Sequence, residues 1–176
     1  MSKIAQETTA KTNFGFVTAT ETRALTFAGG GGNIPDGQGC FVNEIVVTDN
    51  FKITDVTVTL NHLVHSWVGD LAVRLRHRES GRVVELFRRP GQPKFSSSGY
   101  NSDLNGNYSF SDNFTSNFEA AASKNTEIPS GNYASTGNFS AFRGLSSSGT
   151  WQLMINDYSA GDSGSLGSWN LELGWG

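Results

Sequence analysis

Apolar and polar residues alternate in several short stretches of this chain, which is the pattern of half-buried β-strands. In residues 53–60, Val56, Val58 and Leu60 fall on one face and threonines fall on the other. The same alternation predicts strands over residues 24–28, 43–48, 71–76, 82–87, 108–112, 151–156 and 169–173. Only residues 118–122 suggest a short helix or turn. The pattern therefore predicts an all-β sandwich with little helix.

The last two predicted strands carry the largest side chains of the expected core. Trp151 and Trp169 each open a run of residues that face one side of a strand, so we expect both indoles to be buried. Between these strands lies a loop with two aspartates and several glycines. Any chemistry of this region would sit in that loop.

Composition limits the classes of protein to consider. A length of 176 residues suits a single sandwich domain, and 21 glycines and 12 phenylalanines favour short strands joined by turns. Cys40 is the one cysteine, so no intrachain disulfide stabilises the fold. A net charge of −3 argues against a nucleic-acid partner.

Targeting signals are not evident in the sequence. No apolar run is long enough to span a bilayer, and the first residues lack the apolar stretch of a signal peptide. We therefore expect either a cytosolic chain or a fragment of a longer exported protein.

Charge is unevenly distributed along the chain. Residues 74–94 contain seven Arg or Lys and two Glu, whereas residues 95–176 contain seven acids and two bases. The arginines of 74–89 alternate with apolar residues, so we expect most of them on a solvated outer face, with a docking face as the alternative.

Aspartates beside glycine-rich turns are candidate calcium ligands, because calcium takes six to eight oxygens from carboxylates and backbone carbonyls in flexible loops. The candidates are Asp157, Asp162, Asp70, Asp112 and Asp36. Asp157 and Asp162 bracket one turn. The alternative is that these aspartates cap turns by accepting hydrogen bonds from backbone N–H groups.

Two other arrangements of residues are weaker candidates. The segment 161–164 (Gly-Asp-Ser-Gly) resembles the nucleophile motif of trypsin-like proteases, but no upstream histidine motif accompanies it, and a nucleophilic serine needs an oriented base. His62 and His65 are three residues apart, which on a strand puts them on opposite faces unless a bulge intervenes. We therefore expect a glycine-rich turn rather than a catalytic serine, and a structural histidine rather than a zinc site.

Several motifs resemble the P domain of subtilisin-like proprotein convertases, in particular its bacterial branch. In chain order they are Ile34-Pro-Asp36, residues 53–62, the segment His65-Ser-Trp-Val-Gly-Asp-Leu71, residues 80–86, Arg89-Pro-Gly91, Phe110-Ser-Asp112, and the block from Gly149 to Trp169. The resemblance covers roughly residues 34–174 and implies a jelly-roll β-sandwich of about eight antiparallel strands. It divides the chain into an N-terminal extension or first strand, 1–33, and a P-domain-like sandwich, 34–176.

The resemblance also implies a function. P domains follow a subtilisin-like serine protease domain of the furin or kexin type, stabilise it and tune its calcium and pH dependence, and carry no catalytic residues. The expected partner is therefore a subtilisin-like protease domain in cis or in trans, and the expected location is extracellular or at the cell surface. Since no protease domain precedes residue 34, we expect an excised domain or a free-standing protein.

A binding module is the alternative to a protease accessory domain. A calcium-supported jelly roll could recognise carbohydrate or a surface protein, with Trp67, Tyr100 or Trp175 as stacking platforms.

Overall fold

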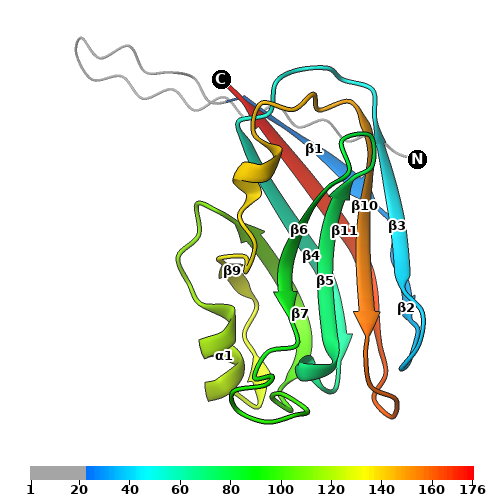
Figure 1. Cartoon of the computed structure of the whole chain (residues 1–176), viewed down its shortest axis with the longest axis vertical. Helices are drawn as coiled ribbons and strands as arrows, with labels where there is room; N and C mark the ends of the chain where they lie inside the picture. The colour runs from blue at the N-terminus through cyan, green and yellow to red at the C-terminus, as the bar shows by residue number, and fades with distance from the viewer. Residues whose placement is uncertain (1–22) are drawn as a thin grey trace, which may run out of the picture.

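Two β-sheets packed face to face make up the part of the chain that the computed structural model describes, residues 23–176 (Figure 1). One sheet has the order β1 (Arg23–Gly29), β11 (Gly164–Trp175), β4 (Asp55–His65), β7 (Asp103–Ser111) and β8 (Glu127–Ile128), with β2 (Gly32–Ile34) beside β11 and β9 (Gly131–Tyr133) beside β7. The other has the order β3 (Phe41–Val47), β10 (Gly149–Asp157), β5 (Leu71–His77) and β6 (Arg82–Arg88). The helices are α1 (Phe118–Lys124) and two 3₁₀ turns, η1 (Val68–Asp70) and η2 (Phe139–Phe142).

The strand order is that of a jelly roll, as expected. The eight strands of seven or more residues divide into β1-β11-β4-β7 and β3-β10-β5-β6, so the chain crosses repeatedly between the two sheets. Three shorter strands were not predicted: β2, β8 and β9 have two or three residues each. Two of these, β8 and β9, run parallel to β7, whereas the other pairs are antiparallel.

The sandwich begins within residues 1–33, the segment that was expected to be an N-terminal extension or a first strand. β1 pairs with β11 from Arg23 to Gly29, and β2 pairs with the start of β11. Residues 1–22 of the predicted extension lie outside the described residues. The boundary at residue 34 falls at the end of β2 and stays a prediction.

The core lies between the sheets and follows the predicted alternation. Trp151, on β10, and Trp169, on β11, are fully buried, which confirms both as core residues. Each indole nitrogen has a partner, since Trp151 Nε1 donates to the Ser147 carbonyl at 3.0 Å and Trp169 Nε1 donates to Asn43 Oδ1 at 2.8 Å. The second bond runs from one sheet to the other, because Asn43 lies on β3.

The segment between β6 and β10 had little periodicity, yet it is folded around aromatic side chains. Phe118 and Ala122 are four residues apart on α1 and are both buried, as expected for one face of a helix. Phe118 contacts Phe87, Phe110 and Tyr133 with ring centroids 4.6–5.4 Å apart. Aromatic packing therefore anchors the long connection to the edge of the sandwich.

Among residues 23–176, no helix has both the length and the apolar character needed to cross a membrane.

Replacing Trp169 with Ala should lower the free energy of unfolding by about 3–5 kcal/mol, because it removes a large buried ring and the hydrogen bond from its indole nitrogen to Asn43 on the other sheet. Urea denaturation monitored by circular dichroism would measure this loss. Phe95→Ala is the matched control, since that ring is 65% exposed and its removal should change stability little. An equal effect of both substitutions would contradict the assignment of Trp169 to the core.

Candidate functional site

Four of the five candidate aspartates lie at one end of the sandwich, at the bottom of Figure 1, where loops from both sheets meet. Strand pairing fixes this end: Asp157 pairs with Leu71, and Gly164 pairs with His65. Asp157 ends β10, and Asp70 ends η1 immediately before β5. The exposed turns add Asp36 and Asp162 to the same end. We call this region the loop end.

Hydrogen bonds tie these turns to one another. Asp36 Oδ1 accepts from the Gly161 N–H at 3.0 Å, and Asp162 Oδ1 accepts from the Ser66 hydroxyl at 2.7 Å. The Asp70 carbonyl accepts from the Tyr158 N–H at 2.9 Å. The β10–β11 turn is therefore connected to the turns before β3 and β5.

Asp112 is not part of the loop end. It follows β7, whose last residue pairs with Thr57, whereas the loop end of β4 pairs with the first residues of β7. Asp112 Oδ1 accepts from the Phe139 N–H at 2.9 Å, and its other oxygen lies 4.0 Å from the Arg143 guanidinium. Asp112 thus accepts from the first N–H of η2, whose N-cap is Asn138.

A buried histidine and a buried aspartate form the centre of the loop end. His65 Nε2 lies 3.0 Å from Asp157 Oδ2, and both side chains are at most 1% exposed. His65 Nδ1 accepts from the Trp67 N–H at 3.1 Å, so the proton of the neutral ring is on Nε2 and is donated to Asp157. Asp157 Oδ1 accepts from the Ser159 N–H at 3.0 Å. Both ring nitrogens of His65 are therefore engaged in structural contacts.

His62 and His65 do not converge. A bulge between Leu60 and Leu63 interrupts the pairing of β4 with β7, and His62 occupies it with φ of +50°. His62 is exposed, whereas His65 is buried. Within residues 23–176, no three His, Cys, Asp or Glu side chains are close enough together to hold a metal ion as the loops stand.

Electrostatic coupling links the acidic groups of the loop end. Burial raises the pKa of Asp70, and the neighbouring charges of Asp157 and Asp162 raise it further. His65 and Arg89 act in the opposite direction. The nearest oxygen of Asp70 is 4.0 Å from the Arg89 guanidinium, so this positive charge offsets the rise in the pKa of Asp70 only in part.

Arg89 connects three loops through contacts that no pattern in the sequence predicted. Its Nε donates to the Gly69 carbonyl at 2.9 Å, and one terminal nitrogen lies 3.5 Å from the Ser159 hydroxyl. The guanidinium also lies 5.6 Å from the centre of the Tyr158 ring. Its backbone has φ of +39°, which is uncommon for a residue other than glycine. In the sequence, Arg89 stood out only as the first residue of the Arg89-Pro-Gly91 motif.

Close backbone packing explains the glycines of this region. A Cβ atom on Gly69 would lie 2.5 Å from the Ser98 carbonyl oxygen and 2.8 Å from the Gly99 Cα. Gly69 N–H donates to the Tyr100 carbonyl at 3.0 Å. Only glycine permits the β4–β5 and β6–β7 loops to approach this closely.

Comparison with known proteins gives a family and a fold. The family model for the proprotein convertase P-domain matches residues 53–173. The crystal structure of the serine protease of Aeromonas sobria is similar, with 16% identity and a TM-score of 0.50 over 87% of this chain and 27% of that chain. The crystal structure of the same protease with its chaperone ORF2 gives 16% identity and a TM-score of 0.51 over 86% and 27%.

Identity at this level shows a common fold. This chain spans about a quarter of the length of the matched Aeromonas sobria chains. The search of curated protein sequences gave no match. The family match includes the strands that carry both His65 and Asp157, so the loop end lies within the matched region.

Proposed function

Because the chain belongs to the proprotein convertase P-domain family, we propose that it is a non-catalytic accessory domain that stabilises or regulates a subtilisin-like serine endopeptidase. The family match over residues 53–173 is the observation that carries this proposal. The similar Aeromonas sobria structures are of a serine protease, and this chain matches about a quarter of that protease chain. The partner is a subtilisin-like protease domain, in cis or in trans, outside the cell or at its surface.

The contacts of His65 are consistent with an accessory role. A serine hydrolase needs a histidine nitrogen free to accept the serine proton. Here Nδ1 accepts from a backbone N–H and Nε2 donates to Asp157. Ser163, in the segment that resembles a protease motif, lies on an exposed turn stabilised by Asp36 and Asp162.

We also propose that calcium supports the domain at the loop end. Asp70 and Asp162 contribute charges that a cation would neutralise, and Asp36 is on the adjoining turn. Both oxygens of Asp157 already accept hydrogen bonds, so its contribution is mainly its charge. Because these carboxylates do not form a ready-made metal site, binding requires the exposed turns of Asp36 and Asp162 to close around the ion.

The accessory role is tested with the subtilisin-like catalytic domain encoded in the same gene, or in the same genome if the gene lacks one. Addition or fusion of this chain should lengthen the half-life of peptidase activity at elevated temperature, because a bound domain stabilises the folded protease by mass action. The Trp169→Ala variant, with its damaged core, should protect less. An unchanged half-life with the intact chain would contradict the accessory role.

The calcium proposal makes a prediction about Asp70→Asn. In calcium the wild-type protein should melt at a higher temperature than in chelator, and Asp70→Asn should lose most of this difference. Asp112→Asn is the matched control and should respond like the wild type, since Asp112 lies away from the loop end. Differential scanning calorimetry measures all three proteins. A wild-type melting temperature that is the same in calcium and in chelator would contradict the proposal.

In chelator, the difference in stability between Asp70→Asn and the wild type should depend on pH. A carboxyl whose pKa is raised on folding binds its proton more tightly in the folded state, so its contribution to stability falls as pH rises from the unfolded to the folded pKa. The asparagine of Asp70→Asn does not ionise, so the variant does not lose stability in this way as pH rises. It should therefore be at least as stable as the wild type at neutral pH in chelator, with a smaller advantage in acid.

A further inference from the structure

The outer face of the four-stranded sheet is an open surface that the loop end does not use. Alternate residues of β3, β10, β5 and β6 point away from the core, and the strand registers place them in rows across the sheet. One central row consists of Glu44, Gln152, Arg76 and Val83. The four strands lie side by side in Figure 1. We call the outward-facing residues among 42–46, 74–76, 83–85 and 152–154 the arginine face.

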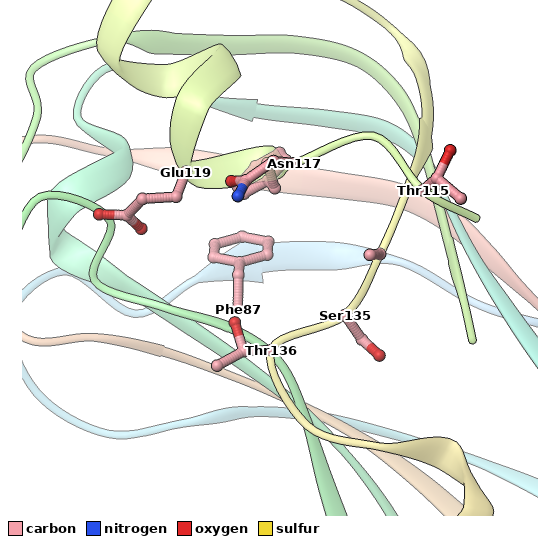
Figure 2. Close-up of a pocket in the computed structure, with 8 residues that line it drawn as sticks. Phe87, Thr115, Asn117, Glu119, Ser135 and Thr136 are labelled. Carbon is pink, nitrogen blue, oxygen red and sulfur yellow. The ribbon is translucent and has the colours of Figure 1, made fainter. Parts of the chain in front are cut away.

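The long β6–β10 connection covers the inner side and the edge of β6, and not its outer side. In Figure 2, the ring of Phe87, a buried residue of β6, points toward Asn117 and Glu119 at the start of α1. Thr136 N–H donates to the Leu86 carbonyl at 2.9 Å, so the same connection also occupies the free edge of β6. The arginine face begins on the opposite side of this strand.

Exposed apolar side chains gather on the arginine face. Among residues 23–176, five large apolar side chains are exposed, and three of these, Val42, Val46 and Val83, belong to this face with exposures of 44–53%. A fourth, Tyr158, adjoins it, because the Arg88 guanidinium at the end of β6 lies 5.2 Å from the centre of its ring. A contiguous group of this kind marks an interaction surface, whereas single exposed apolar residues do not.

The outer face of the seven-stranded sheet has a different composition. One of its rows consists of Ala28, Asn170, Thr59 and Ser109, and the hydroxyl oxygens of Thr59 and Ser109 are 2.7 Å apart. Short polar side chains of this kind suit a solvated surface. Arginine and methionine, in contrast, are enriched in protein–protein interfaces, and the arginine face includes Met154 beside its arginines. The two outer faces of one sandwich therefore differ as a solvated surface differs from an interface.

Arg76, at the centre of the arginine face, has no acidic neighbour. Its partners in the strand register are Gln152 and Val83, neither of which is charged. The next outward positions along the chain are Arg74 and Arg78, which carry the same charge as Arg76. Within residues 23–176, Arg76 makes no ion pair. Its half-buried side chain therefore presents an uncompensated guanidinium in the middle of the face.

The two carboxylates of the arginine face have other contacts. Glu44 accepts from the Gln152 amide at 2.8 Å, and Glu85 lies 4.0 Å from the Arg88 guanidinium. A guanidinium that is removed from water needs a charged partner, and its fork suits a carboxylate. A surface that covers this face must therefore bring a carboxylate to Arg76.

We propose that the arginine face docks the subtilisin-like protease domain, through a protease surface that gives a carboxylate to Arg76 and apolar contacts to Val46 and Val83. This inference rests on the proposed accessory function and adds the surface through which that function acts.

Charge complementarity disfavours a second copy of this chain as the occupant. Two arginine faces brought together would oppose the same excess of positive charge, and the carboxylates that each copy could offer are those of Glu44 and Glu85, which already have partners. A different protein with an acidic and partly apolar surface meets both requirements of the face.

The test titrates the full chain into the subtilisin-like catalytic domain encoded in the same gene or genome and records the half-life of peptidase activity at elevated temperature. The concentration of chain that gives half of the protection should rise roughly 10- to 150-fold for Arg76→Ala, the effect of one lost hydrogen bond between charged groups. Val83→Ala should raise it roughly 4- to 15-fold, because one or two fewer methyl groups are buried. Added salt should weaken protection by the wild type more than protection by Arg76→Ala. In a fusion of the two domains, Arg76→Glu should remove most of the protection.

Arg23→Ala and Arg23→Glu are the matched controls, since Arg23 is an exposed arginine on β1, in the other sheet, and both should protect like the wild type. Circular dichroism should show the wild-type fold for every variant, because none of them changes a core residue. If the wild type protects and the Arg76 and Val83 variants protect equally well, the arginine face is not the docking surface, and the accessory role stands. If the wild type gives no protection, both are wrong. A dimer of this chain in sedimentation equilibrium that Arg76→Ala dissociates would make a second copy the occupant and would also overturn the proposal.

Discussion

The hydrogen bond between His65 and Asp157 joins the two sheets at the loop end, and the arrangement of that end depends on it. His65 is the last residue of β4, in the seven-stranded sheet, and Asp157 is the last residue of β10, in the four-stranded sheet. A carboxylate buried this deeply requires compensating donors. It receives them from the His65 ring and from the Ser159 N–H, so strand ends and turn are fixed together.

The remaining contacts of the loop end extend from this pair. Trp67 N–H orients the histidine ring, and η1 then leads directly to Gly69 and Asp70. Arg89 contacts the Gly69 carbonyl and lies beside Asp70, which brings the β6–β7 loop to the same place. The result is a rigid buried network with acidic groups on its exposed rim. A cation bound there would stabilise turns that the network already positions, which is how calcium could act on the stability of the whole domain.

Periodicity made the long strands predictable, because each buries one face of alternate residues over seven or more positions. It could not reveal β8 and β9, which are too short to show a period and depend on the packing of Phe118 and Tyr133. Asp157 and Asp162 were predictably close because they flank one turn. The contact between His65 and Asp157 was not, since 92 residues separate them and only the crossing of the jelly roll brings them together.

A double-mutant cycle between His65→Phe and Asp157→Asn tests the central role of this pair most directly. The free energy of unfolding of the wild type, the two single variants and the double variant would be measured by urea denaturation. We expect a coupling energy of about 1.5–3 kcal/mol, the range for a hydrogen bond to a charged group. Additivity of the two substitutions within about 0.5 kcal/mol would contradict the claim that this bond holds the two sheets together.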